Sequence, residues 1–322
     1  MRIKLLLFFF FFFALSFLSF KLIYHLPVKF SDNKIIYINP GLTVDKLGKI
    51  LQKEKLIKSN TLFKTILNIT GQDKKILHGE YLFSEKTSLY SVIKSITSGN
   101  YYYRKISIPE CSTVDQILNI IGQNTFLSGY IENKPVEGSI FPETYFFLRN
   151  EDKNKVLIRM QKKMNKVIGA IWQENNDIIK SKKELIKLAS MIEAEALIKK
   201  EKYLISSVFY NRLRKKMRLQ SDPTILYAKN LNKNIKTRKI FKRDLRSDNP
   251  WNTYTRHGLP KTAICNPGFD AIEAAMTPKH SNYLYFVSDG TGGHRFSSDL
   301  EQHTLNVKIW REKLRDNNET KK

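Results

Sequence analysis

The sequence predicts an α+β protein with an N-terminal membrane anchor, a small α/β module, and a mostly helical C-terminal part with a small antiparallel sheet. Three observations support this class. Residues 5–24 form an apolar run, strand and helix patterns alternate over residues 35–100, and longer helical patterns follow residue 150. Separate runs of helix and strand are typical of α+β domains. We expect the following segments: a stub at 1–4, the anchor at 5–24, the module at 35–100, a connecting segment at 101–150 and the C-terminal domain at 151–322.

The N-terminus indicates a membrane anchor. Arg2 and Lys4 form a basic leader, and residues 5–20 carry no charge. The residues after Phe20 are bulky, whereas a signal-peptidase site needs small side chains. We therefore expect an uncleaved helix that crosses the membrane once. Because basic leaders stay in the cytoplasm, the N-terminus is expected there, with the rest of the chain outside the cell inner (cytoplasmic) membrane.

The net charge of +25 permits three interpretations, namely nucleic-acid binding, attraction to an anionic membrane or wall polymer, and a general bias toward lysine. Lysine is spread along the whole chain, and no nucleic-acid-binding motif stands out. We expect a lysine bias with a membrane or wall contribution, and no nucleic-acid partner. Cys111 and Cys265 are expected to be free, buried thiols, although an exported protein could join them. Neither a metal site nor a cofactor is predicted.

The module at 35–100 is expected to contain two strands and three helices. Thr43 is a predicted N-cap of the first helix, because its hydroxyl can accept a hydrogen bond from a free backbone N–H. The expected strands are 35–38 and 78–83, and the later helices are 60–69 and 88–97. This strand–helix–helix–strand order suits a compact binding or positioning unit better than a catalytic domain.

Beyond the module, a strand at 101–108 and a helix at 113–121 precede the longer helices at 154–172, 184–200 and 202–215. Asp222 followed by Pro223 is typical of a helix start, with aspartate as N-cap and proline in the first turn. Near the C-terminus, glycines at 289–293 predict the turn of a hairpin with strands at 283–287 and 294–297.

One glutamate lies on the apolar side of a predicted helix. At 100° per residue, Glu193 falls among Ala189, Ala196 and Leu197, whereas Glu195 falls on the polar side. A carboxylate on an apolar face is either paired or takes up a proton. Glu193 is therefore either a buried structural glutamate next to an arginine or a general acid. Glu195 is expected to form an ion pair or to support Glu193.

Polar and aromatic residues gather in three clusters downstream, at 218–224, 249–254 and 292–297. Amide, hydroxyl and aromatic groups together are typical of a sugar-binding site. Taken singly, each cluster has a local explanation as a helix cap, a turn or a hairpin.

The order of these motifs resembles the endolytic murein transglycosylase (YceG-like) family. The resemblance covers residues 35–305 and is carried by the segments 79–81, 108–110, 137–145, 189–195, 211–213, 219–224, 252–254, 258–260, 266–268, 285–287 and 293–296. Four positions depart from the usual family residues: Cys111, Ala194, Trp251 and Lys261. None of them replaces the candidate acid.

The resemblance implies a LysM-like module at 35–100, a catalytic domain at 151–322, and cleavage of the MurNAc–GlcNAc β-1,4 bond inside a glycan strand. The product would end in 1,6-anhydro-MurNAc. Glu193 matches the catalytic glutamate, and the candidate substrate-binding residues are Gln220, Asp222, Asn252 and Tyr254. A membrane-anchored enzyme of this kind would stop the elongation of nascent strands, with cell-wall synthases as partners.

Two other functions remain open at this point. A muramidase would hydrolyse the same bond with water and use Asp222 as a second carboxylate. A non-catalytic wall-binding protein would depend on the module at 35–100. The three functions predict different products, namely an anhydro end, a reducing end or none.

Overall fold

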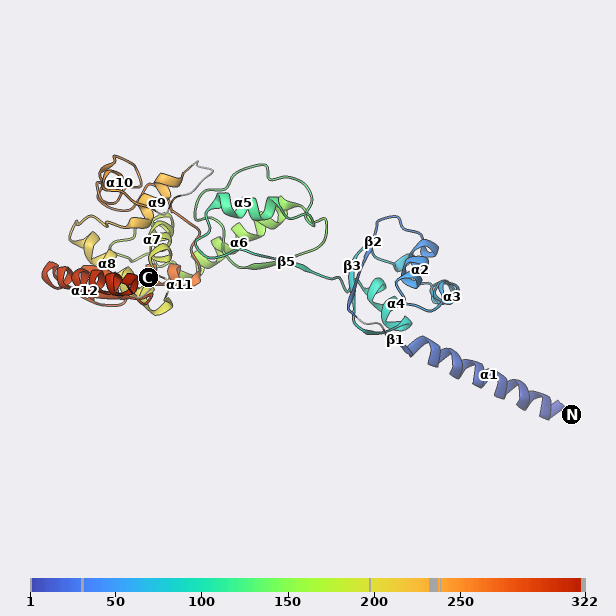
Figure 1. The fold of residues 1–322 in the computed structure, drawn as a ribbon. Coiled ribbons are helices and arrows are strands. Elements are labelled where there is room, and N and C mark those ends of the chain that lie inside the picture. Colours follow the sequence, from blue (N-terminus) through green and yellow to red (C-terminus); the bar gives the residue numbers. More distant parts are fainter. Residues whose placement is uncertain (1, 30–31, 197, 232–236, 238, 320–322) are drawn as a thin grey trace. The chain divides into compact units, whose positions relative to one another are not determined.

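The computed structural model describes residues 2–29, 32–196, 198–231, 237 and 239–319. The chain divides into two compact units, which are described separately below (Figure 1). The first contains Met1–Lys105 and Phe146–Glu151, and the second contains Ile106–Tyr145 and Asp152–Lys322. Strands β5 (Arg104–Ser107) and β6 (Thr144–Phe147) pair with each other, and the division falls within both of them. The predicted α+β class is confirmed.

The N-terminal helix α1 (Arg2–His25) contains neither proline nor glycine, so nothing in its sequence interrupts it. The phenylalanines at 8–13 are all exposed. Within the described residues, one helical stretch, Leu7–His25, is long and apolar enough to cross a membrane. This is compatible with the predicted anchor, and a signal sequence would have the same properties.

In the rest of the first unit, β2 (Lys34–Ile38) pairs antiparallel with β3 (Gly79–Phe83), and β1 (Pro27–Lys29) pairs with β4 (Lys86–Ser88). Between β2 and β3 lie α2 (Val44–Lys53), α3 (Asn60–Ile69) and the short 3₁₀ helix η1 (Asp73–Lys75), and α4 (Leu89–Ser98) follows. The predicted strand–helix–helix–strand order is confirmed. Thr43 caps α2 as expected, because its hydroxyl accepts the Lys46 N–H at 3.3 Å.

A buried carboxylate that the sequence analysis missed stabilises this unit. The side chain of Glu80 is 1% exposed and binds Arg104 at 2.7 Å and Arg149 at 2.9 Å. Burial opposes its ionisation, but hydrogen bonds from the two guanidinium groups outweigh burial and lower the pKa of Glu80.

The second unit is mostly helical. Its helices are α5 (Val114–Gly122), α6 (Lys153–Ile171), α7 (Lys182–Glu195), α8 (Lys199–Arg214), α9 (Asp222–Asn230), α10 (Lys242–Arg246), α11 (Phe269–Met276) and α12 (Leu300–Glu319). The predicted hairpin is confirmed: β7 (Tyr285–Ser288) pairs antiparallel with β8 (His294–Ser297). The short α10 and the helices α11 and α12 were not predicted.

Helix α7 lies in the core of the second unit and packs against α8, α9 and α11. Its residues Leu188, Ala189, Met191 and Ile192 are fully buried. The helix begins after Ser181, whose hydroxyl accepts the Glu184 N–H at 3.2 Å. Packing on several sides holds the last turn of α7, which carries both Glu193 and Glu195, in a fixed position.

Cys111 and Cys265 form a disulfide with their Cα atoms 4.8 Å apart, so the prediction of two free thiols is wrong. Backbone hydrogen bonds flank the bridge: Cys111 N–H donates to Asn266 O, and Asn266 N–H donates to Ser112 O, each at 3.0 Å. The two cysteines are 154 residues apart in sequence, so no local spacing could reveal the pairing.

We expect replacement of both cysteines by serine to lower the free energy of unfolding by about 2–4 kcal/mol, because the bridge closes a long loop and restricts the unfolded chain. Urea denaturation of wild-type and variant protein, each with and without reductant, measures the effect. Reductant should destabilise the wild type and leave the variant unchanged. Equal stability of oxidised wild type and variant would contradict the expectation.

Candidate active site

The last turn of α7 points two carboxyl groups in different directions. Glu193 and Glu195 are two residues apart, which corresponds to a rotation of about 200° around the helix axis. Glu193 is buried, as predicted, whereas Glu195 is partly exposed. The two groups therefore experience different surroundings.

Glu193 lies in a buried ion pair. Its Oε1 accepts from Lys202 Nζ at 2.7 Å, and both side chains are 5% exposed. Its Oε2 accepts the Gly268 N–H at 2.9 Å. Burial raises the pKa of Glu193, while Lys202 and the Gly268 N–H act against this rise and Glu110 adds to it. The partner is a lysine from the next helix rather than the expected arginine.

Glu195 has a neutral partner. Its Oε1 accepts a hydrogen bond from the Ser221 hydroxyl at 2.7 Å. Within the described residues no cation lies within ion-pair distance of it, so the predicted ion pair is wrong. Burial among protein atoms raises the pKa of Glu195 to about 7; Ser221 and Arg212 act against this rise and Asp222 adds to it.

Arg212 acts on Glu195 only from a distance. Its guanidinium is buried and donates to Leu284 O at 2.6 Å and to Leu219 O at 2.7 Å. These carbonyls hold the positive charge in place. Arg212 therefore lowers the pKa of Glu195 through space without using either of its oxygens.

The turn before α9 holds Ser221 against Glu195. Gln220 has a φ of 50°, and its N–H donates to Thr253 O at 3.1 Å. The Ser221 N–H donates to Thr253 Oγ1 at 2.9 Å, and Thr224 Oγ1 lies 3.0 Å from the same oxygen. The two predicted clusters around residues 220 and 252 are therefore joined side by side. The Gln220 side chain itself is exposed.

Asp222 and Tyr254 form a polar pair at the start of α9. The Tyr254 hydroxyl donates to Asp222 Oδ1 at 2.6 Å. Burial and the neighbouring Asp222 carboxylate both raise the pKa of Tyr254. Asp222 is exposed and is the first residue of α9, so the N-cap is Ser221, one residue earlier than predicted. Asp222 is near enough to Glu195 to raise the pKa of Glu195.

Asn252 holds a loop and is 1% exposed. Its Nδ2 donates to Ser247 O at 2.7 Å and to Leu245 O at 3.2 Å, and its Oδ1 accepts the Tyr254 N–H at 2.8 Å. The Asn252 amide is thus bound to backbone groups, and its contact with sugar stays a prediction. Asn252 also positions Tyr254.

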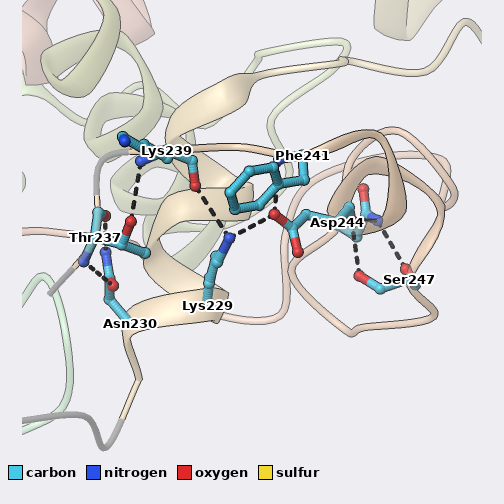
Figure 2. A network of polar contacts seen from close by, with 8 residues as sticks. Lys229, Asn230, Thr237, Lys239, Phe241, Asp244 and Ser247 are labelled. Carbon is cyan, nitrogen blue, oxygen red and sulfur yellow. Dashed lines mark hydrogen bonds and ion pairs between the residues drawn. The ribbon is translucent and has the colours of Figure 1, made fainter. Parts of the chain in front are cut away.

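A polar network between α9 and α10 supports that loop (Figure 2). Lys229 Nζ binds Asp244 Oδ2 at 2.6 Å and Lys239 O at 3.0 Å. The Phe241 N–H donates to Asp244 Oδ2 at 2.8 Å. At the end of α9, Asn230 exchanges two hydrogen bonds with the backbone of Thr237, each 2.8 Å long. The network fixes α10, whose last residues and the following Ser247 provide the carbonyls that bind Asn252.

The third predicted cluster lies in the β7–β8 hairpin. His294 Nδ1 lies 2.8 Å from Glu201 Oε2, and the His294 N–H donates to Glu201 Oε1 at 3.0 Å. This pair joins the hairpin to the first turn of α8. The described residues contain no group of three or more His, Cys, Asp or Glu side chains arranged to hold a metal ion.

The sequence did not predict the roles of three residues of the site: Lys202, Ser221 and Arg212. Ser221 and Arg212 stood inside the motifs at 219–224 and 211–213, so their segments were singled out without their roles. Lys202 had no signal beyond a place nine residues after Glu193.

Comparisons with known proteins agree on one family. The model of the YceG-like family matches residues 36–309. The endolytic murein transglycosylase of Bacillus subtilis (strain 168) is 31% identical over 311 residues, which cover 86% of this chain and 85% of that protein. The endolytic murein transglycosylase of Streptococcus pneumoniae serotype 2 (strain D39) is 27% identical over 88% of this chain and 59% of that protein. The crystal structure of a yceG-like protein from Listeria monocytogenes has a TM-score of 0.56 and 28% identity, over 85% of this chain and 98% of that one.

We expect Lys202→Met to lower the free energy of unfolding at pH 8 by about 3–5 kcal/mol, because it leaves the Glu193 carboxylate buried without a counter-charge. A carboxyl whose folded-state pKa is raised contributes most to stability below its unfolded value and loses that contribution as pH rises through the folded value. The destabilisation should therefore be smaller at pH 5. Urea denaturation at the two pH values measures it.

The double variant Glu193→Gln with Lys202→Met is the matched control, since a neutral amide replaces the stranded carboxylate. It should recover part of the stability that Lys202→Met loses at pH 8. If Lys202→Met is as stable as the wild type at pH 8, the ion pair does not support the fold.

Proposed function

Because the chain belongs to the YceG-like family, we propose that it is an endolytic murein transglycosylase, a lyase that cleaves peptidoglycan glycan strands. The bond cleaved is the β-1,4 link between MurNAc and GlcNAc within a strand, and the product ends in 1,6-anhydro-MurNAc. The relatives from B. subtilis and S. pneumoniae carry this enzyme name. The observation that supports the chemistry here is the Glu195 carboxyl group, which accepts a hydrogen bond from the neutral Ser221 hydroxyl next to the Asp222–Tyr254 pair.

We propose Glu195 as the general acid and base. In the protonated form it donates its proton to the glycosidic oxygen as the bond from C1 to that oxygen breaks. The resulting carboxylate then accepts the proton of the MurNAc C6 hydroxyl as O6 attacks C1 and closes the anhydro ring. The proton count balances, and neither water nor a second carboxylate is needed. A pKa of about 7 suits both steps, because the group is neither always charged nor always neutral near pH 7.

Glu193, the acid predicted from the sequence, is less suited to proton transfer in this geometry. Both of its oxygens already accept hydrogen bonds, one from Lys202 and one from Gly268. A proton on either oxygen would turn an acceptor into a donor that faces another donor. In our proposal Glu193 holds α7, α8 and the Gly268 loop together. Its role as acid stays a prediction that the variants below test.

Gln220, Asp222 and Tyr254 are the candidates for contact with the sugar. The first two are exposed, and the Tyr254 hydroxyl is bound to Asp222. The muramidase alternative uses the same residues differently, with Asp222 as the base that activates water. Product analysis separates the two: an anhydro end supports transglycosylation, and a reducing end supports hydrolysis. A wall-binding protein without activity would give neither.

We propose that α1 anchors the enzyme in the cytoplasmic membrane, with its N-terminus inside and the catalytic unit outside. The exposed phenylalanines of α1 and the basic leader support this orientation. An enzyme held there would meet glycan strands as synthases produce them and would terminate their elongation. We also propose that the module at 35–100 is LysM-like, and its strand–helix–helix–strand order supports this.

We expect Glu195→Gln to reduce strand cleavage by about 10²–10⁴-fold, the usual contribution of general acid–base catalysis, because the amide has nearly the same shape but cannot transfer the proton. The measurement is mass spectrometry of the products released from purified murein. Glu193→Gln is the paired variant and should lose less activity. If folded Glu193→Gln is inactive and Glu195→Gln retains activity, the acid is Glu193.

The pH dependence provides a second measure of the same assignment. Because the acid must be protonated to begin the reaction, kcat/KM should fall as pH rises above about 7. Burial also raises the pKa of Glu137 to about 7, so a Glu137→Gln variant is needed. If the alkaline fall disappears in that variant, the titration belongs to Glu137.

The stability of Glu195→Gln serves as its folding control, because the ionisation of Glu195 is coupled to the stability of the fold. The raised folded-state pKa means that ionisation of Glu195 costs stability as pH rises from about 4.5 to about 7. The glutamine variant should therefore be at least as stable as the wild type at pH 8. A large loss of stability there would mean that inactivity reflects misfolding.

A further inference from the structure

We propose that a pocket beside the last turn of α7 binds the peptide branch of the murein strand that is being cleaved. The inference rests on the proposed function and adds a part of the substrate that the acid and the sugar-facing residues do not contact. The pocket has a volume of about 440 Å³, within the range of roughly 300–1,000 Å³ common for small-ligand sites.

The pocket borders the proposed catalytic residues along the chain at two points. Ala194 lines it, and the next residue, Glu195, is the last residue of α7. Pro223 also lines it and directly follows Asp222, which accepts the Tyr254 hydroxyl. Because these two lining residues adjoin Glu195 and Asp222 in the chain, the proposal assigns the pocket to a substituent on the sugar next to the scissile bond.

The chemistry of the lining matches a short peptide better than a sugar. Apolar walls come from the Cys111–Cys265 bridge, Ile264 and Leu226. Small aliphatic groups, such as the methyl of an alanine residue, suit such walls. The lining also contains polar side chains, among them Thr113 and Gln116, which can hydrogen-bond to the amide groups of a peptide.

The pocket lining also contains two opposite charges, Lys134 and Asp115. Lys134 Nζ lies 2.5 Å from Asp115 Oδ1, and the two side chains are 55% and 52% exposed. A lysine ammonium has three donors and a carboxylate has two acceptor oxygens, so each retains hydrogen-bonding capacity after pairing with the other. A peptide with both a carboxylate and an ammonium group complements this pair, whereas a neutral glycan does not.

Buried polar contacts hold the walls in place. Glu137 Oε1 accepts from the Val114 N–H at 2.9 Å and from Asn266 Nδ2 at 3.0 Å. Its Oε2 accepts from the Tyr227 hydroxyl at 3.3 Å. Glu137 thus joins the start of α5, the loop after the disulfide, and α9. At the far end of α9, Asn230 lines the pocket while its amide is bound to Thr237 (Figure 2). These contacts connect three walls of the cavity to one another.

The test compares two substrates with the full-length protein in detergent: glycan strands with their peptides, and the same strands after an amidase has removed the peptides. The variants are Lys134→Gln and Asp115→Asn. Lys163→Gln is the matched control, because Lys163 on α6 forms a similarly exposed ion pair with Glu143 and does not line the pocket. The measured quantity is the ratio of the cleavage rate on peptide-bearing strands to that on stripped strands.

We expect this ratio to fall about two- to fivefold in Lys134→Gln and in Asp115→Asn, because each variant loses one exposed charge contact with the peptide. In Lys163→Gln the ratio should keep its wild-type value. Acetylation of the peptide amines should lower the ratio in the wild type and have no further effect in Asp115→Asn. An unchanged ratio in both pocket variants, or an equal fall in the control, overturns the proposal.

A binding measurement separates this proposal from the proposed function. The free murein tetrapeptide is titrated against wild-type protein and Lys134→Gln by calorimetry. Weaker binding to the variant supports the pocket, and equal binding or none to both overturns it. Failure of the wild type to cleave either strand instead overturns the enzymatic function, and the calorimetry still decides what the pocket binds.

Discussion

The buried ion pair between Glu193 and Lys202 is the constraint on which the site depends. Two charges removed from water are costly unless they are paired and hydrogen-bonded. Here the pair is completed by the Gly268 N–H, so α7, α8 and the start of α11 must meet at one point. With Glu193 fixed inward, the helical rotation of about 200° turns Glu195 to the opposite side of α7. The position of the proposed acid is thus a consequence of its neighbour's burial.

The environment of Glu195 is adjusted by groups that are themselves immobilised. Ser221 donates to it, but the Ser221 backbone is held by Thr253, and the Thr253 loop is held by Asn252. Arg212 is bound to backbone carbonyls and acts on Glu195 only through its charge. Groups held in this way are the preorganised surroundings that the proposed general acid would need. The network of Lys229 and Asp244 is connected to Glu195 only indirectly, through α10 and the Asn252 amide that α10 binds.

Local sequence patterns predicted the elements of the first unit and the β7–β8 hairpin, but not α10, α11 or α12, and long-range pairing explains the failures at the site. The Thr43 cap and the 289–293 turn involve only neighbouring residues, and both were found where expected. The burial of Glu193 followed from its helical phase. The partners of Glu193 could not be predicted in this way, because Gly268 lies 75 residues away in the sequence. The disulfide spans 154 residues, and the amide of Asn252 turns inward to bind carbonyls that no spacing rule identifies. A polar residue in a motif can therefore support the site through the backbone groups that it binds.

Helix α9 connects the proposed chemistry to the proposed peptide pocket. Its first residue, Asp222, faces Tyr254 and acts on Glu195, while Pro223 and Tyr227 on the same helix line the pocket. Tyr227 is in turn bound to Glu137, which contacts the loop beside the disulfide. A shift of α9 would alter both places together, because nine residues of one helix cannot bend independently. If both proposals hold, the disulfide and Glu137 stabilise more than the fold: by fixing one wall of the proposed pocket they also fix its position relative to Glu195.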